Sequence, residues 1–477
     1  MPVDARRPLL EASNGWRDSQ GVIDSDPSYD AYDPKRWPAP YKWAIIALLA
    51  SMAFVVTFTC TSVVPVASYI VRDLDKDSSS PSASVLLVTI WELGEAAGPF
   101  FLAPLSETFG RYPVVNTANV LFISATILAA LCRSTPVFIG ARALTGLAVV
   151  TNVLNPAIVG DLMAPEQRGF AMSMIAMAPL LGGAAGPAIG SVVAESLGWR
   201  QVIWVSVAMA SICEIMILAC LRETCHTVIL RRLPKRLPSE LDSLCGNNND
   251  GAWESVLRPV VILCGSGVLM ALCLFSGVAF AFAYVFYVTL PDILQVVYKQ
   301  PLAVQGSAFM SYTVGLAFSV LLCNRTLDRL YVRLGKSNDG VGQPEFRLPL
   351  AVIGAILLPA CVMLHGFVAQ LRLPLALLLL SSASLGATTM LSVLPIMAYV
   401  VDAFGSYPAS AMAGLIFVRS LAATFLPLGA GLLIAKYGYA RGLAVLSASC
   451  LCVAPIPMLV LRHGPRWRQR SKYSRDV

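Results

Sequence analysis

Two glutamates lie within an apolar stretch of the chain, where ionisable groups are uncommon. The stretch at 85–105 contains Glu92 and Glu95 in the sequence Trp91-Glu92-Leu93-Gly94-Glu95. Their spacing of three residues puts both carboxyl groups on one face of a helix. A carboxyl group in apolar surroundings favours its neutral form, so it can take up and later release a proton. The first apolar stretch, 43–70, holds no acid, so we expect Glu95, with Glu92 beside it, to carry a proton.

Two arginines also lie inside apolar stretches. A guanidinium keeps its proton, and placing it in lipid costs about 2.5 to 3.5 kcal/mol unless it meets a wet cavity or a carboxylate. Arg142 lies about as deep in its stretch as Glu92 does in its own, so a pair of Arg142 with Glu92 or Glu95 is expected. Alternatively, the two acids only neutralise Arg142 or line a static polar seam. Arg419 lies near the middle of another stretch, where a backbone carbonyl or an acid could orient it.

The composition of the whole chain is that of a membrane protein. Of its 477 residues, 56% are hydrophobic and 13% are charged, whereas about a quarter of the residues in a soluble domain are charged. The apolar residues form stretches of about 20, the length that crosses a hydrocarbon core of about 30 Å as a helix. We therefore expect an all-α polytopic membrane protein with twelve transmembrane helices in a lipid bilayer. The predicted spans are 43–70, 85–105, 114–132, 136–160, 171–194, 202–221, 260–288, 302–323, 348–369, 374–400, 408–434 and 441–461.

The longest polar stretch between spans divides them into two sets of six. With twelve spans both termini lie on one side, and 25 of the 35 Lys and Arg fall on that side, against eight on the other. Because positively charged loops stay in the cytoplasm, we expect both tails and the linker to be cytoplasmic. The net charge of +7 does not indicate a nucleic-acid partner, since the basic residues are spread among the loops. The predicted units are an N-terminal tail at 1–42, a six-helix bundle at 43–221, a linker at 222–259, a second six-helix bundle at 260–461 and a basic tail at 462–477.

The loop after the second span carries a short motif. It reads Ala103-Pro104-Leu105-Ser106-Glu107-Thr108-Phe109-Gly110-Arg111. This is a tight turn in which Gly110 relieves the backbone, and Glu107 and Arg111 can pair across the bundle. It resembles the major facilitator signature Gly-x-Leu-(small)-Asp-x-x-Gly-Arg, in the Pro-Leu-Ser-Glu form of fungal multidrug:proton antiporters. The resemblance implies a gating latch, and a simple capped turn is the alternative. The latch residues would be Leu105, Ser106, Glu107, Gly110 and Arg111.

A second motif lies in the fifth span. Small residues at every fourth position let two helices touch closely, and a proline permits a bend. Gly182, Gly186, Pro187 and Gly190 resemble the Gly-x-x-x-Gly-Pro-x-x-Gly motif that marks antiporters in this superfamily. The resemblance extends from about residue 33 to about residue 475, and Arg419 matches an arginine that recurs in the fungal group.

On these residues the chain is identified as a member of the major facilitator superfamily, in the fungal drug:proton antiporter group. The resemblance implies a plasma-membrane monomer that exports small lipophilic molecules (drugs, toxins or a secondary metabolite) in exchange for protons. No cofactor is expected, because the proton gradient drives such a cycle. Export of polyamines or other organic cations is the alternative, and a membrane sensor that does not transport is another. Aromatic residues of the seventh and tenth spans would line the substrate cavity: Tyr284, Tyr287 and Tyr399.

The sequence does not indicate an enzyme. Its three histidines, His226, His365 and His463, are scattered, with no nucleophile-base arrangement and no metal-ligand spacing. Many of the twelve cysteines lie in apolar stretches, also without metal-ligand spacing. The phosphate-binding loop of ATP-driven pumps does not occur in the sequence. We therefore expect neither catalysis nor a metal site.

Overall fold

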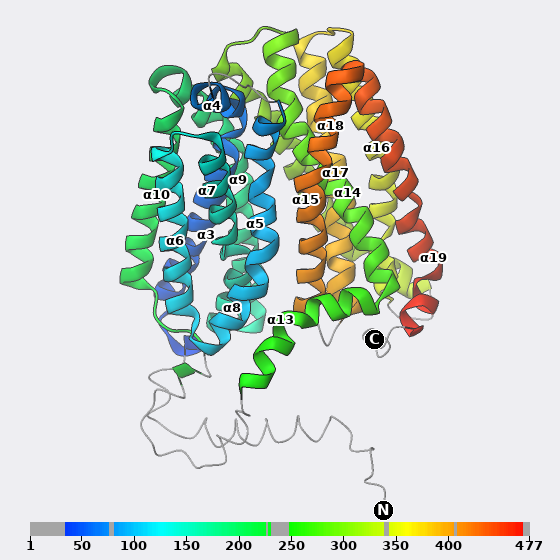
Figure 1. The fold of residues 1–477 in the computed structure, drawn as a ribbon. Helices are drawn as coiled ribbons and strands as arrows, with labels where there is room; N and C mark the ends of the chain where they lie inside the picture. The colour runs from blue at the N-terminus through cyan, green and yellow to red at the C-terminus, as the bar shows by residue number, and fades with distance from the viewer. Residues whose placement is uncertain are drawn as a thin grey trace, which may run out of the picture.

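The chain folds into two helical bundles that stand side by side (Figure 1). The computed structural model describes residues 34–75, 81–225, 228–229, 248–337, 343–404 and 408–470, and within these residues it contains helices and no strands. Helices are the form in which a single segment can satisfy its own backbone groups in lipid. The expected all-α fold with twelve transmembrane helices is confirmed.

Each bundle contributes six crossings. In the first bundle they are α3 (Ala39–Ser62) continued by α4 (Ala67–Leu74), α5 (Pro81–Thr108), α6 (Arg111–Leu131), α7 (Thr135–Leu147) with α8 (Thr151–Leu162), α9 (Pro165–Leu197) and α10 (Trp199–Cys220). In the second they are α14 (Gly267–Asp292), α15 (Leu302–Ser337), α16 (Pro349–Gln370), α17 (Leu375–Ala403) and α18 (Pro408–Val453), which supplies two crossings and continues into α19 (Pro455–Arg470). Helix α3 begins and α19 ends at one end of the molecule, which we call the terminal end; the other is the opposite end (Figure 1).

Two crossings are irregular. Ten segments of the described chain meet a simple criterion of length and hydropathy for crossing a membrane, and the irregularities account for the other two. The fourth crossing is broken between α7 and α8, which are each short. The eleventh and twelfth are joined in α18, where Gly438 leaves the helical conformation with φ of +80°. Such a φ favours glycine because it has no Cβ.

The seventh crossing begins later than the predicted span at 260–288. Residues up to Gly265 belong to α13 (Asn248–Gly265), which runs along the terminal end (Figure 1). The hydroxyl of Ser266 accepts a hydrogen bond of 3.4 Å from the N–H of Leu269 and so caps α14. The predicted boundary between linker and bundle therefore falls within α13. Parts of the predicted tails and linker, 1–33, 226–227, 230–247 and 471–477, lie outside the described residues.

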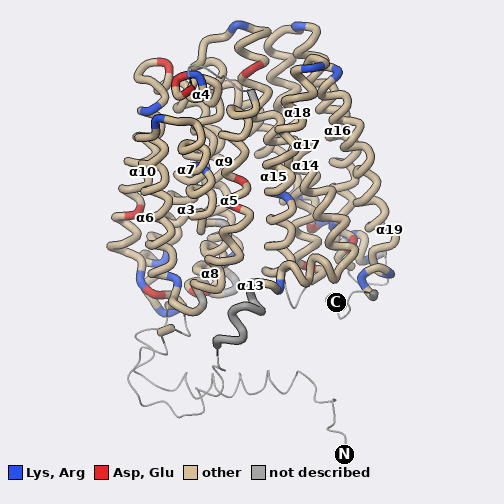
Figure 2. The backbone as a smooth tube through the Cα atoms, in the orientation of Figure 1, with Lys and Arg blue, Asp and Glu red and all other residues tan. Residues whose placement is uncertain are grey.

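The two bundles meet along two pairs of helices, and their outer surface is apolar. Helix α5 packs on α18, and α9 packs on α15. Charged residues gather at the two ends of the molecule, and few lie at middle height (Figure 2). Large apolar side chains such as Ile215, Leu380 and Leu432 are between 65% and 67% exposed, which suits contact with lipid. The protein is a multi-pass membrane protein.

Candidate functional site

Glu92 lies on α5 where the two bundles meet. Its carboxylate accepts a hydrogen bond of 2.6 Å from the hydroxyl of Tyr284, which lies on α14 of the other bundle. The side chain of Glu92 is 2% exposed, and its Oε2 has no hydrogen-bond partner in the described part of the chain. A proton on this carboxyl group would change a bond that joins α5 to α14. Glu92 is therefore an acid whose hydrogen bond joins the two bundles.

Glu95 lies one turn further along α5 and makes its described contact within the first bundle. Its Oε2 accepts a hydrogen bond of 3.3 Å from the indole N–H of Trp91. The ring of Trp91 in turn lies 4.7 Å from the guanidinium of Arg142. The geometry therefore favours Glu92, rather than Glu95, as the acid at the bundle interface.

Arg142 pairs with neither glutamate, so that prediction was wrong. Its guanidinium donates hydrogen bonds to the carbonyl oxygens of Thr59 (3.0 Å) and Cys60 (2.9 Å) on α3. Helix α3 ends at Ser62, and the last four carbonyls of a helix lack partners within it. Two of these carbonyls, together with the face of the Trp91 ring, therefore hold this arginine, which is 2% exposed. Every residue type has a backbone carbonyl, so the sequence could not predict that carbonyls would be the partners of Arg142.

Arg111 begins α6, and its partners are Ser106 of the predicted latch motif and two acids from outside that motif. Its Nε lies 3.5 Å from Oδ2 of Asp161 at the end of α8, and its Nη1 donates to the hydroxyl of Ser106 (2.5 Å). Glu223, shortly after α10, accepts a hydrogen bond of 2.8 Å from the backbone N–H of Arg111. An acid at this place satisfies free N–H groups at the start of α6 and complements the helix dipole. The side chain of Glu107 lies outside the described residues.

The remaining latch residues take different parts in this turn. Gly110 has a φ of +107°, and a Cβ there would overlap the carboxylate of Glu223. Leu105 is 43% exposed and does not take part in the polar contacts around Arg111. Sequence reasoning missed Asp161 and Glu223. The available signal was an acid at the end of the fourth span and another directly after the sixth.

The second bundle repeats one of these contacts at the same end of the molecule. Arg347 lies in the short helix η4 (Pro344–Arg347), which precedes α16. It forms ion pairs with Asp402 near the end of α17 (2.5 Å) and Asp328 on α15 (2.8 Å). In both bundles, therefore, an arginine after the second crossing pairs with an aspartate at the end of the fourth.

Tyr399 is fully buried in this structure, and its predicted place in a substrate cavity stays a prediction. Its side chain is 0% exposed and lies near Glu345 at the terminal end of the second bundle. Glu345 is 1% exposed and lies 3.5 Å from Nε of Arg468 on α19. Burial raises the pKa of the Glu345 carboxyl group. Tyr399 is thus part of the packed core because α17 turns this side of its helix toward its own bundle.

The two other predicted cavity tyrosines lie in an aromatic cluster of the second bundle. The rings of Tyr284 and Tyr287 are 5.5 Å apart. Tyr287 also contacts Phe309 (5.8 Å) and Tyr312 (5.6 Å) on α15. Tyr284 alone of this group has a described bond to the first bundle, through Glu92. A substrate role for either tyrosine stays a prediction.

The glycines of the second motif bring α9 against α3. A Cβ on Gly182, Gly186 or Gly190 would overlap backbone atoms of α3. The carbonyl oxygen of Pro187 lies on another side of α9 and is in close contact with Gly306 of α15. The motif therefore contacts its own bundle through glycines and the other bundle through Pro187.

Among the residues that the structure describes, Arg419 has neither a backbone carbonyl nor an acid as a partner. Its guanidinium lies over the ring of Phe280 on α14, 4.1 Å from the ring centre. Its Nε is buried without a hydrogen bond, and no ion pair of this residue is found within the described residues.

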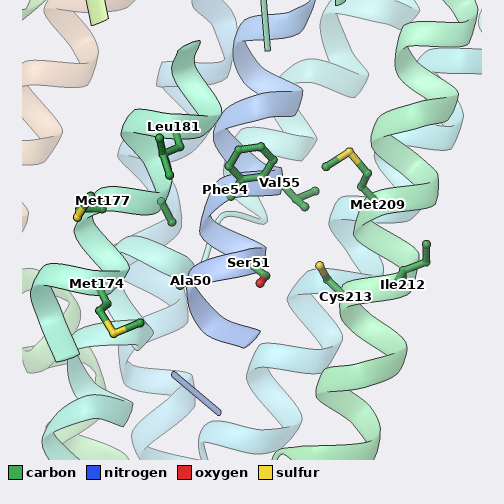
Figure 3. Close-up of a pocket in the computed structure, with 11 residues that line it drawn as sticks. Ala50, Ser51, Phe54, Val55, Met174, Met177, Leu181, Met209, Ile212 and Cys213 are labelled. Carbon is green, nitrogen blue, oxygen red and sulfur yellow. The ribbon is translucent and has the colours of Figure 1, made fainter. Parts of the chain in front are cut away.

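An open groove lies between α3, α9 and α10 of the first bundle (Figure 3). Its volume is about 510 Å³, and its walls are mainly methionine and other apolar side chains. The hydroxyl of Ser51 in the wall is already bonded to the carbonyl of Ala47. Nothing in this groove resembles a site for a proton or a charged group. Among the described residues, no cluster of His, Cys, Asp and Glu suited to a metal ion is found either.

Two six-helix bundles that meet around polar groups at middle height form the architecture of a secondary transporter. The family model of the Major Facilitator Superfamily matches residues 49–427, and the chain belongs to this family. It is 29% identical to the efflux pump radE of Floropilus chiversii over 99% of this chain and 89% of that protein. It is 28% identical to the MFS transporter cpaT of Aspergillus oryzae over 94% and 92% of the two chains.

Solved transporters share the fold. The xylose transporter XylE of E. coli, in a partially occluded inward open conformation, matches with a TM-score of 0.66 and 17% identity, over 89% of this chain and 98% of that one. The human organic anion transporter MFSD10 matches with a TM-score of 0.59 and 20% identity, over 88% and 100%.

Proposed function

We propose that this protein is a proton-coupled antiporter that exports small lipophilic organic molecules, such as drugs, toxins or a secondary metabolite. It would act as a monomer in the plasma membrane by alternating access, with both termini in the cytoplasm, driven by the proton gradient alone. Membership of the family and similarity to fungal proteins named as an efflux pump and an MFS transporter support export of small molecules.

The hydrogen bond between Tyr284 and Glu92 carries the proton-coupling part of the proposal. A hydroxyl donates more strongly to a charged carboxylate than to a neutral carboxyl group. Protonation of Glu92 would therefore weaken a tie between α5 and α14 and favour movement of one bundle against the other. Substrate binding would favour the opposite state, so that exchange follows from differential affinity.

Export of polyamines or other organic cations is the second candidate. The Oε2 of Glu92 has no hydrogen-bond partner in the described residues and could receive an ammonium group. The same acid would then bind substrate instead of the coupling proton. A transport assay must therefore include a cation.

The test uses the full chain in proteoliposomes with an imposed pH step and three probes: rhodamine 6G, fluorescein and spermidine. We expect uphill transport of a dye by the wild type, and a loss of about tenfold or more in Glu92→Gln, because the amide cannot exchange a proton. Gel filtration would show that the variant remains folded. Glu214→Gln is the matched control, since Glu214 is also buried but bonds Asn119 (2.7 Å) within the first bundle.

A further variant tests the two acids of α5 together. The double variant Glu92→Gln, Glu95→Gln should not pump uphill at any imposed pH step. If it does so with unchanged pH dependence, both acids are structural and the coupling site lies elsewhere. Transport of spermidine alone would support the second candidate instead.

A further inference from the structure

Arg419 and Arg142 both lie within membrane-spanning helices, but they differ in exposure and in their contacts. Arg142 is 2% exposed and donates to two backbone carbonyls. Arg419 is partly exposed, and the contact described for it is the face of Phe280. A permanent charge at membrane depth is expected to face a counter-charge or a hydrated space. Arg142 has dipoles that fulfil this need, whereas Arg419 still has donors available for a ligand.

The height of Arg419 in the molecule follows from the contacts of α18 with α5. On one side of it along α18, the ring of Phe417 lies 5.4 Å from the ring of Phe100. On the other side, the hydroxyl of Thr424 donates to the carbonyl oxygen of Thr89 (3.4 Å). Both contacts join the two bundles, so Arg419 lies at a level where the bundles meet.

Glu92 lies in the same section of the interface. It lies on α5 between Thr89 and Phe100, the residues whose contacts bracket Arg419 on α18. In this section the first bundle thus contributes an acid and the second bundle contributes an arginine. Substrates of such two-bundle transporters bind near the middle of the membrane between the bundles.

Aromatic rings extend from Arg419 toward Glu92. The Phe280 ring beneath the guanidinium lies 5.8 Å from the ring of Tyr284, and the Tyr284 hydroxyl bonds Glu92. A flat aromatic molecule could stack along these rings while an acidic group meets the guanidinium. Guanidinium groups bind carboxylates through paired, charge-assisted hydrogen bonds.

We propose that Arg419 binds the anionic group of the exported substrate, and that the substrate class is aromatic acids bearing a carboxylate or a phenolate. Phe280 and Tyr284 would support the aromatic body. This inference rests on the proposed export function and specifies its substrate. It also distinguishes the protein from an exporter of organic cations, for which Arg419 would repel the cargo.

The test measures equilibrium binding to the purified full chain without a proton gradient. Two xanthene dyes serve as probes: fluorescein, which carries a carboxylate and a phenolate, and rhodamine 6G, a cationic ester. Fluorescence anisotropy should show tighter binding of fluorescein than of rhodamine 6G. Arg419→Ala and Arg419→Gln should each weaken fluorescein binding by about tenfold or more, with little effect on rhodamine 6G.

Arg329→Ala is the matched control, because Arg329 is exposed at the terminal part of α15. Arg419→Lys keeps the charge and should retain part of the affinity for fluorescein. Unchanged fluorescein binding in both neutral variants, equal weakening of the two dyes, or a wild-type preference for rhodamine 6G would overturn the inference. These binding results do not depend on whether the protein transports the dyes. Failure of the wild type to move any dye against a gradient would instead contradict the proposed function.

Discussion

Arg111 is held in two ways, by its side chain and by its main chain. The side chain contacts Asp161 and Ser106, while the backbone N–H donates to Glu223. The side-chain contacts join α6 to α5 and α8 at the terminal end, where the ends of these helices would separate or close during a transport cycle. Removing the side chain would therefore loosen this end while the tie to Glu223 is retained.

We expect Arg111→Ala to slow uphill dye transport by about tenfold at normal abundance, because the Asp161 carboxylate loses its cation in one state of the cycle. The measurement is the initial rate in proteoliposomes per mole of folded protein. Arg329→Ala should behave as the wild type, since that side chain is exposed. Normal transport by Arg111→Ala would remove the latch role of this turn.

At the scale of elements, α9 connects the two bundles toward the opposite end. Its Pro187 carbonyl lies against Gly306 of α15. One end of the same helix supplies Glu195, whose carboxylate accepts a hydrogen bond of 2.7 Å from the N–H of Ala303 at the start of α15. A carboxylate at the start of a helix complements its dipole. Together these contacts hold α9 against α15 toward the opposite end of the molecule.

Gly306→Ala should open that end, because the added Cβ would overlap the Pro187 carbonyl, which is backbone and cannot move aside alone. We expect about tenfold slower transport and faster thiol labelling of a cysteine placed at position 303. Gly429→Ala is the matched control, since a Cβ there meets nothing within 4 Å. Equal labelling of the two glycine variants would mean that this contact does not hold the end closed.

At the scale of the whole molecule, charged residues gather at both ends (Figure 2). By the count from the sequence, more Lys and Arg belong to the terminal end than to the opposite end. Such an asymmetry orients membrane proteins with the more basic side in the cytoplasm. The structure places the start of α3 and the end of α19 at that one end, with α13 beside them (Figure 1). Orientation in the membrane thus follows from a property of the whole chain.

We expect a cysteine placed at position 248, at the start of α13, to resist an impermeant thiol reagent in intact cells and to react after permeabilisation. Lys436→Cys should react in intact cells, because Lys436 is exposed near the opposite end. Both changes need a background in which the twelve native cysteines are replaced. Labelling of position 248 in intact cells would reverse the predicted orientation.

The sequence by itself determined the twelve crossings, because the length of an apolar stretch is a local property. It also predicted which side chains are unusual at membrane depth, since Glu92, Arg142 and Arg419 interrupt apolar runs. The starts and ends of crossings were less well predicted. Ser266 and Gly438 show why, because a side-chain cap or a left-handed backbone decides these boundaries.

Only the tertiary structure decided how those side chains are paired. A helix in lipid is apolar on both its packed face and its lipid face, so the sequence pattern does not reveal its rotation about its own axis. That rotation turned Tyr399 into the core of its own bundle and brought Tyr284 to Glu92, a residue 192 positions away. It also gave Arg142 the carbonyls at the end of α3 and left Arg419 over a single aromatic ring.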